Sequence, residues 1–155
     1  MSDPTNITFT HSDLTTPVVV TAGILDFVKY SLVLGSYNPL GVGPYTTPIN
    51  ILPISAPGVP GFSLNSVVAG SKQITGQLAL PTETGNTPLV KFQYSITEPA
   101  VWLDFNPTKT SAGAFTIAVP SDDATYPLRF RAVNAVGVGS ATEVANLYVP
   151  RYVSP

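Results

Sequence analysis

The chain has 155 residues, a formal net charge of −2, only 10% charged residues and no cysteine. The lack of cysteine excludes disulfide bonds and thiolate metal sites, and no Lys or Arg cluster is present that could neutralise a nucleic-acid backbone. The 16 prolines and 12 glycines punctuate short runs rich in Val, Ile, Thr, Tyr and Phe, so the composition predicts an all-β protein.

The first part of the chain begins with a polar stretch after Met1 and shows neither an apolar signal core nor a transmembrane run. We therefore expect a chain that is not inserted in a membrane. Two strands are predicted in this part, over residues 5–11 and 17–22.

The next part predicts two more strands, over residues 29–37 and 45–52. Apolar or small side chains recur in the first of them at a period of two, which is typical of a strand with one buried face: Tyr30, Leu32, Leu34 and Ser36. A tight connection follows, marked by Asn38, Gly41 and Gly43.

Residues 53–60 carry three prolines in eight positions. Proline fixes φ and favours an extended path, so residues 55–60 are predicted to form a semi-rigid linker. This linker divides the chain into a first region, residues 1–54, and a second domain, residues 61–150, followed by a tail at 151–155.

The second domain predicts seven strands, bounded by turn residues. They span residues 61–69, 73–80, 89–96, 102–105, 114–119, 126–134 and 141–149. The inward side chains expected on the second and third of these strands are Ile74, Gly76, Leu78 and Leu80, and Phe92, Tyr94 and Ile96.

The sixth strand of this domain has the clearest pattern in the chain. Tyr126, Leu128, Phe130 and Ala132 alternate with Arg129 and Arg131, and Asn134 closes the run. Two glycines follow, which can take positive-φ conformations in a hairpin: Gly137 and Gly139.

This stretch resembles the end of a fibronectin type III domain, whose sixth strand reads Tyr-x-hydrophobic-x-hydrophobic-x-Ala-x-Asn before Gly-x-Gly. The resemblance implies a seven-stranded, immunoglobulin-like β-sandwich in which Tyr126 forms a structural tyrosine corner. Leu78 stands where the family usually has a core tryptophan. Trp102 resembles the tryptophan of the bacterial and large-virus type, and we expect it to be half-buried.

The same phrase occurs 96 residues earlier, where seven positions match without a gap: Tyr30, Leu32, Leu34, Ser36, Asn38, Gly41 and Gly43. At this offset Phe9 falls on Phe105 and Val19 on Phe115. Only 29 residues precede Tyr30, so the first region corresponds to the last four strands of the domain. We expect a truncated half-sandwich that lacks its first three strands.

A half-sandwich leaves backbone edges unpaired and an apolar core open. The outer face of its central strand carries Val33 and Gly35 in place of two arginines, and Tyr37 follows on the same side. We therefore expect an interface at these residues, together with Phe9 and Val19, that is completed by strand pairing with a partner. The alternative is a small rearranged sheet that folds back on the second domain.

Candidate catalytic residues are scarce. His11 is the only histidine and has no visible partner, and Asp122-Asp123 is the only adjacent acidic pair, in a predicted turn. No phosphate-binding loop opens a helix, and no base is available to activate a Ser or Thr. The sequence therefore predicts no catalytic, metal or cofactor site, and a protein that is not an enzyme.

Two function classes remain. The favoured one is a structural assembly protein, namely a minor capsid, cement or fibre component located in a virion. Its partners would be other copies of itself or a capsid or fibre protein, joined through strand pairing, with no nucleic acid. The alternative is an extracellular or cell-surface adhesion module that binds a protein or glycan through loops at the end of the second sandwich.

Overall fold

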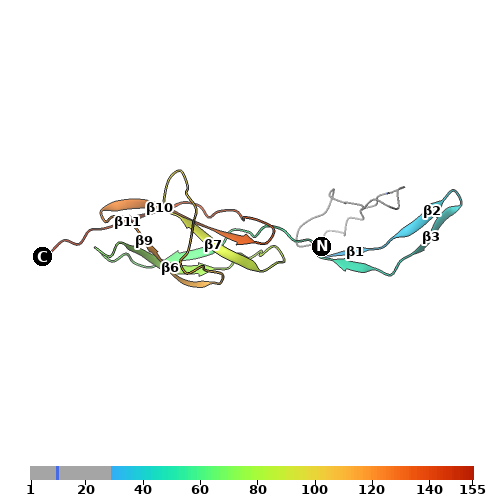
Figure 1. Cartoon of the computed structure of the whole chain (residues 1–155), viewed down its shortest axis with the longest axis horizontal. Coiled ribbons are helices and arrows are strands. Elements are labelled where there is room, and N and C mark those ends of the chain that lie inside the picture. Colours follow the sequence, from blue (N-terminus) through green and yellow to red (C-terminus); the bar gives the residue numbers. More distant parts are fainter. Residues whose placement is uncertain (1–9, 11–28) are drawn as a thin grey trace. The chain divides into compact units, whose positions relative to one another are not determined.

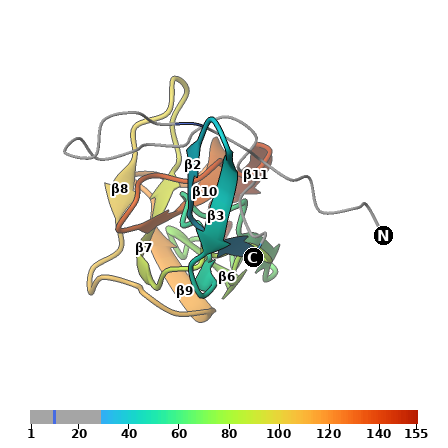
Figure 2. The same ribbon diagram turned by 90° about the vertical axis from the view of Figure 1, so that its right-hand side faces the viewer.

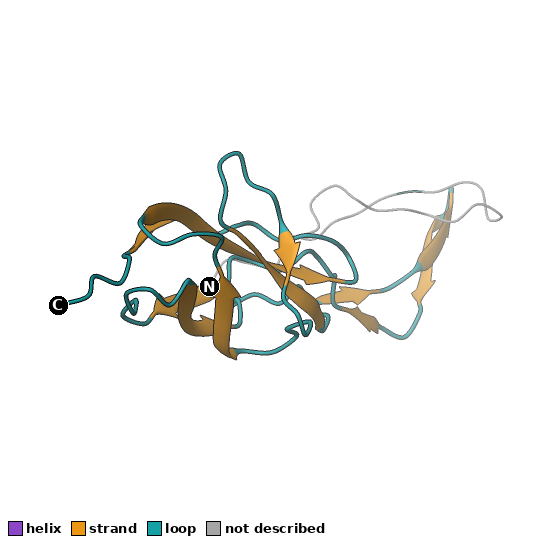
Figure 3. Ribbon diagram, turned by 60° about the vertical axis from the view of Figure 1, so that its left-hand side comes forward, coloured by secondary structure: helices purple, strands orange, loops and turns teal. Residues whose placement is uncertain are grey.

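The computed structural model describes residue 10 and residues 29–155, and the chain divides into two compact units, Met1–Pro53 and Ile54–Pro155 (Figure 1). All regular elements of the described residues are antiparallel β-strands, which confirms the all-β prediction (Figure 3). No helix in this part of the chain could cross a lipid bilayer. The strands predicted over residues 5–11 and 17–22 lie outside the described residues, as do Phe9, His11 and Val19.

The described part of the first unit is one long hairpin, residues 30–51, which we call the N-terminal hairpin. β1 pairs with β4 near the open end of the hairpin. β2 pairs with β3 near its turn, and Figure 2 shows these two strands side by side. The four strands are β1 Tyr30–Leu32, β2 Gly35–Asn38, β3 Gly41–Tyr45 and β4 Ile49–Ile51.

Both strands predicted in this hairpin differ in their bounds from the observed strands. The strand predicted over residues 29–37 is interrupted between β1 and β2. Of the strand predicted over residues 45–52, Tyr45 is the last residue of β3 and Ile49–Ile51 form β4. The connection is also shorter than expected. Gly41 begins β3 with a φ of 141° and Gly43 lies inside the strand, because a turn of only Pro39 and Leu40 reverses the chain.

The second unit is a β-sandwich with two sheets. One sheet has three strands in the order β5-β6-β9, and the other has four in the order β11-β10-β7-β8. The strands are β5 Gly61–Leu64, β6 Gln73–Ala79, β7 Leu89–Ser95, β8 Leu103–Asp104, β9 Gly113–Ala118, β10 Ala124–Asn134 and β11 Ala145–Val149. β7, the third strand of this unit, thus lies between β8, the fourth, and β10, the sixth.

The core of the sandwich is aromatic and aliphatic. Phe130 is fully buried at its centre, and its ring centroid lies 5.0 Å from the centroids of both Phe62 and Phe115. Leu78 is also buried, so a leucine fills the place of the family's usual tryptophan. Tyr94 and Ile96 pack against this core, as predicted.

All seven strands of the second unit differ from their predicted bounds by at least one residue. The first strand ends at Leu64, and the last begins only at Ala145. Leu80 is 50% exposed and does not face inward, because β6 ends at Ala79 and Pro81 follows.

The segment predicted as a linker, residues 55–60, is bound to the second unit. The Ser55 amide donates to the Gly85 carbonyl at 3.1 Å, and the Gly58 amide donates to the Glu83 carbonyl at 2.7 Å. Pro57 is buried in the same segment. These residues therefore belong to the sandwich and do not form a free spacer.

Candidate assembly interface

Tyr126 forms the tyrosine corner that the sequence predicted. Its hydroxyl donates to the Ser121 carbonyl at 2.8 Å and accepts the Ser121 amide at 3.1 Å, while its ring is buried in the core. The residue is therefore structural, because both hydrogen bonds fix the chain where it enters β10.

Asn134 fixes the other end of β10. Its Oδ1 accepts the amides of Val136 and Gly137 at 2.9 and 3.1 Å, which forms the turn, and its Nδ2 donates to the Ser55 carbonyl at 2.6 Å. This buried side chain thus holds the turn and the entry segment together.

Positive φ is not the reason for the two glycines after this turn, contrary to the sequence prediction. A Cβ on Gly139 would lie 2.2 Å from the Pro57 carbonyl oxygen, so close backbone approach explains this residue. A Cβ on Gly137 would meet nothing within 4 Å, and the structure does not explain that glycine.

The N-terminal hairpin has the same strand register as the β10–β11 hairpin, residues 124–149, at the 96-residue offset found in the sequence. Tyr30 is opposite Ile51, as Tyr126 is opposite Leu147. The further equivalent pairs are Ser31–Asn50 with Pro127–Asn146, Leu32–Ile49 with Leu128–Ala145, and Tyr37–Val42 with Val133–Val138.

The hydrogen bonds that break the ladder are equivalent as well. Thr46 donates its amide to the Leu34 carbonyl at 2.8 Å and accepts the Leu34 amide on its Oγ1 at 3.0 Å. Thr142 and Phe130 make the same two bonds at the same two distances. Asn38 also accepts the Leu40 amide at 2.9 Å, as Asn134 accepts that of Val136.

The two hairpins differ in what pairs with their first strand. β10 lies between β11 and β7, and Arg129 to Asn134 are paired with β7. Within the described residues, β2 pairs with β3 alone. Leu34 directs its backbone groups toward Thr46, so alternate residues direct theirs the other way, toward an edge made by Val33, Gly35 and Tyr37 that no other described strand pairs with.

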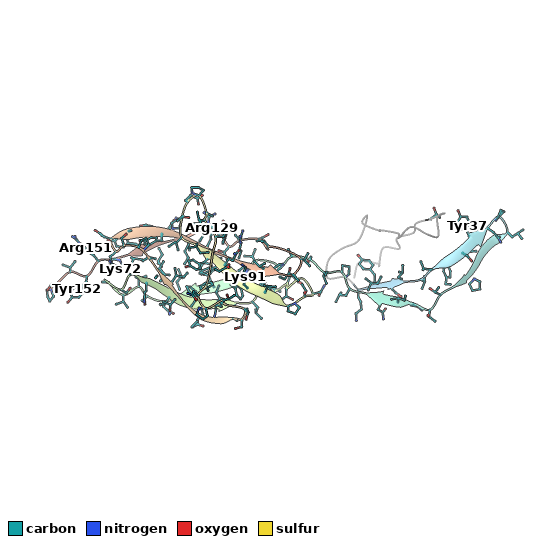
Figure 4. All side chains as sticks on the ribbon, in the orientation of Figure 1. Tyr37, Lys72, Lys91, Arg129, Arg151 and Tyr152 are labelled. Atoms are coloured by element: carbon teal, nitrogen blue, oxygen red, sulfur yellow. The ribbon has the colours of Figure 1, made fainter. Side chains whose placement is uncertain are left out.

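Both faces of the N-terminal hairpin are apolar. On the face that is equivalent to the sandwich core, Leu34 is 51% exposed, whereas its counterpart Phe130 is fully buried. On the other face, Tyr37 is 69% and Tyr45 66% exposed, and Figure 4 shows Tyr37 projecting from the hairpin. A Cβ on Gly35 would lie 2.8 Å from the Tyr45 ring, so this glycine leaves room for the aromatic side chain.

The equivalent outer face of the second unit is polar. The Arg131 guanidinium lies 4.1 Å from the centre of the Trp102 ring, and its Nε donates to Gln93 at 2.8 Å. Trp102 is therefore half-buried by packing, as predicted. Figure 4 shows Lys91 and Arg129 on this unit; Lys91 binds Asp104 at 2.8 Å, and Arg129 pairs with Glu98.

Electrostatic shifts on the second unit follow from these contacts. Hydrogen bonds from Lys91 and then Gln93 hold the pKa of the Asp104 carboxyl below its usual range, and burial lowers the pKa of Arg131. A hydrogen bond to Asp123 raises the pKa of Tyr148. Each group has a structural partner, so none of these shifts marks a reactive residue.

The remaining polar candidates do not assemble into a site. Asp122 accepts the Lys72 amide at 3.2 Å in the turn where the sequence placed it. The described residues contain no group of three His, Asp or Glu side chains that could hold a metal ion. A shallow hollow of about 510 Å³ lies between the loops of the sandwich and is lined by uncharged residues, among them Leu80, Asn86, Pro88 and Thr110.

The second unit thus has the immunoglobulin-like fold of fibronectin type III (FNIII) domains. No protein-family model matches the chain. It is similar to the fourth FNIII domain of a human protein, with 15% identity over 66% of this chain and 86% of that one and a TM-score of 0.51. It is also similar to domains A168–A170 of titin, with 15% identity over 77% of this chain and a TM-score of 0.51.

The chain spans 40% of the titin chain that it matches. At this identity both likenesses show the fold alone.

Proposed function

We propose that the protein is a non-enzymatic assembly component whose N-terminal hairpin is completed by strands from a partner. Among residues 29–155, the hairpin supplies an edge that no strand pairs with, and two apolar faces. The sandwich of residues 54–155 has its own core and is a module that can be carried by the assembly.

One observation carries this proposal. Two hairpins of one chain share register and hydrogen bonds, yet the one at residues 124–149 is embedded in a sandwich and the one at residues 30–51 has no neighbouring strand among the described residues. An apolar face and an unpaired edge are costly in water, and natural proteins cover them. The β7 strand shows what kind of cover fits: an antiparallel strand with alternating apolar side chains.

The assembly that we propose is a virus particle, in which the protein is a minor capsid, cement or fibre component. This finer assignment is supported by the resemblance of the Trp102 region to fibronectin-type domains of bacteria and large viruses, together with the low charge and the lack of cysteine. A density map of the native particle is the direct test, with the protein expected at repeated positions.

Deletion of residues 1–53 tests the proposal in solution. We expect the full chain to be oligomeric by light scattering and residues 54–155 to be a folded monomer. A full chain that stays monomeric at high concentration, with residues 30–51 protected from hydrogen exchange, would contradict it, because the hairpin would then be covered within its own chain.

A second candidate is an adhesion module, and the hollow between Leu80, Asn86, Pro88 and Thr110 favours it. These residues lie at loops of the sandwich, where a protein or glycan ligand would bind. Glycan-array binding by residues 54–155 that is lost on Asn86→Ala would support this function, and it would not depend on the hairpin.

A further inference from the structure

The open edge of the N-terminal hairpin fits a second copy of this chain. Resting on the proposed assembly function, we propose that β2 of one copy pairs antiparallel with β2 of another, around a two-fold axis at Ser36. Two hairpins would then form one continuous four-stranded sheet.

Charge is the first argument for this occupant. No Asp, Glu, Lys or Arg lies between Lys29 and Lys72, so the whole hairpin is uncharged. Edge strands are usually protected from pairing by charged side chains, and this edge has none. A two-fold contact brings each residue close to its own counterpart, which an uncharged edge permits without repulsion.

Backbone geometry is the second argument. Gly35 and Tyr37 direct their amide and carbonyl groups outward, and Ser36 lies between them. With Ser36 opposite Ser36 of the second copy, Gly35 of each copy faces Tyr37 of the other as a hydrogen-bonded pair, and all side chains stay on their own face. The two copies exchange four backbone hydrogen bonds in this register.

Side-chain size fits the same register. Gly35 already has the Tyr45 ring packed across it within the chain. In the paired sheet, Tyr37 of the second copy approaches Gly35 from the side opposite Tyr45. The glycine and these two tyrosines then form one continuous surface. Aromatic side chains next to glycine are favourable cross-strand neighbours.

A cysteine at the two-fold axis tests the register directly, because the chain has no native cysteine. In a non-hydrogen-bonded antiparallel pair the Cα atoms lie about 4.5 Å apart, which is within the range of a disulfide. We expect Ser36→Cys in the full chain to form a covalent dimer under mild oxidation. Ser31→Cys is the matched control, and we expect it to stay uncrosslinked.

Opposed charges give a second measurement in the same chain. Ser36→Lys places two lysines directly opposite each other and should raise the dissociation constant up to about fivefold at low salt, whereas Ser31→Lys, with the same added charge, should leave it unchanged.

The outcomes separate this inference from the assembly function. An oligomeric chain in which Ser36→Cys does not cross-link, or cross-links no better than Ser31→Cys, overturns the pairing at Ser36 but leaves the assembly proposal standing. A chain that is monomeric at every concentration overturns both.

Discussion

The N-terminal hairpin and the β10–β11 hairpin follow the same register in different surroundings. Both have a threonine that bonds twice across the ladder and an asparagine that closes the turn. One is buried in a sandwich, and the other has most of its large side chains exposed. The comparison teaches that local hydrogen bonds specify the shape of this hairpin, whereas the burial of the β10–β11 hairpin comes from other strands of the second unit, among them β7.

The largest expected difference between the two hairpins is in the free energy of unfolding, when the equivalent residues Phe130 and Leu34 are truncated. Phe130→Ala removes a fully buried ring and should lower the free energy of unfolding of the second unit by about 3–5 kcal/mol. Leu34→Ala, at the equivalent position, should change it by less than about 0.5 kcal/mol. Denaturant unfolding of the full chain measures both, and similar losses would show that Leu34 belongs to the same cooperative core.

Substitution of the turn asparagines should likewise cost more stability in the β10–β11 hairpin than in the N-terminal hairpin. Asn134→Ala leaves buried partners without hydrogen bonds and should destabilise the second unit by about 1–3 kcal/mol. Asn38→Ala removes one exposed bond and should leave that unit unchanged. Thermal unfolding decides this, and an unaffected Asn134→Ala variant would show that the anchor to Ser55 does not contribute to stability.

A smaller effect is expected at the tyrosine corner. Tyr126→Phe keeps the buried ring and loses only the hydroxyl bonds to Ser121, so it should cost about 1–1.5 kcal/mol. Tyr148→Phe is a control on the same sheet, because its hydroxyl bond to Asp123 is exposed. If the two variants unfold alike, the corner adds nothing beyond its ring.

The smallest expected effect is on the pH dependence of stability. It comes from the polar outer face of the second unit, which the N-terminal hairpin lacks. The folded pKa of Asp104 is lowered by Lys91 and Gln93, so its contribution to stability is present above the unfolded pKa of about 3.9 and is lost as pH falls through the folded pKa. An NMR titration of the carboxyl group should show the lowered value, and Lys91→Met should raise it. A midpoint that does not move in this variant would contradict the assigned cause.

The sequence predicted the sandwich well because its signals are local. The alternation from Tyr126 to Asn134 and the 96-residue repeat both reappear in the structure as strand registers. The interruptions were missed because side chains cause them: a threonine hydroxyl replaces a ladder bond at Thr46 and Thr142, which no periodicity reveals.

The sequence also does not reveal the binding of residues 55–60 to the sandwich, since three prolines in residues 53–60 are typical of a spacer. That segment is held by the side chain of Asn134, a contact across 79 positions of the chain. The candidate interface at Val33, Gly35 and Tyr37 is a prediction from the exchange of arginines for apolar residues. Its backbone geometry depends on the Leu34–Thr46 bonds, which only the structure reveals.

The uncharged run between Lys29 and Lys72 determines how a contact between the hairpin and a partner strand would respond to salt. Salt weakens an interface by screening its ions, and an interface made only of amide, carbonyl and hydrocarbon groups contains no ions to screen. Such an interface would have the same affinity in dilute buffer and in physiological sodium chloride. A particle built with it would therefore stay assembled when the ionic strength changes.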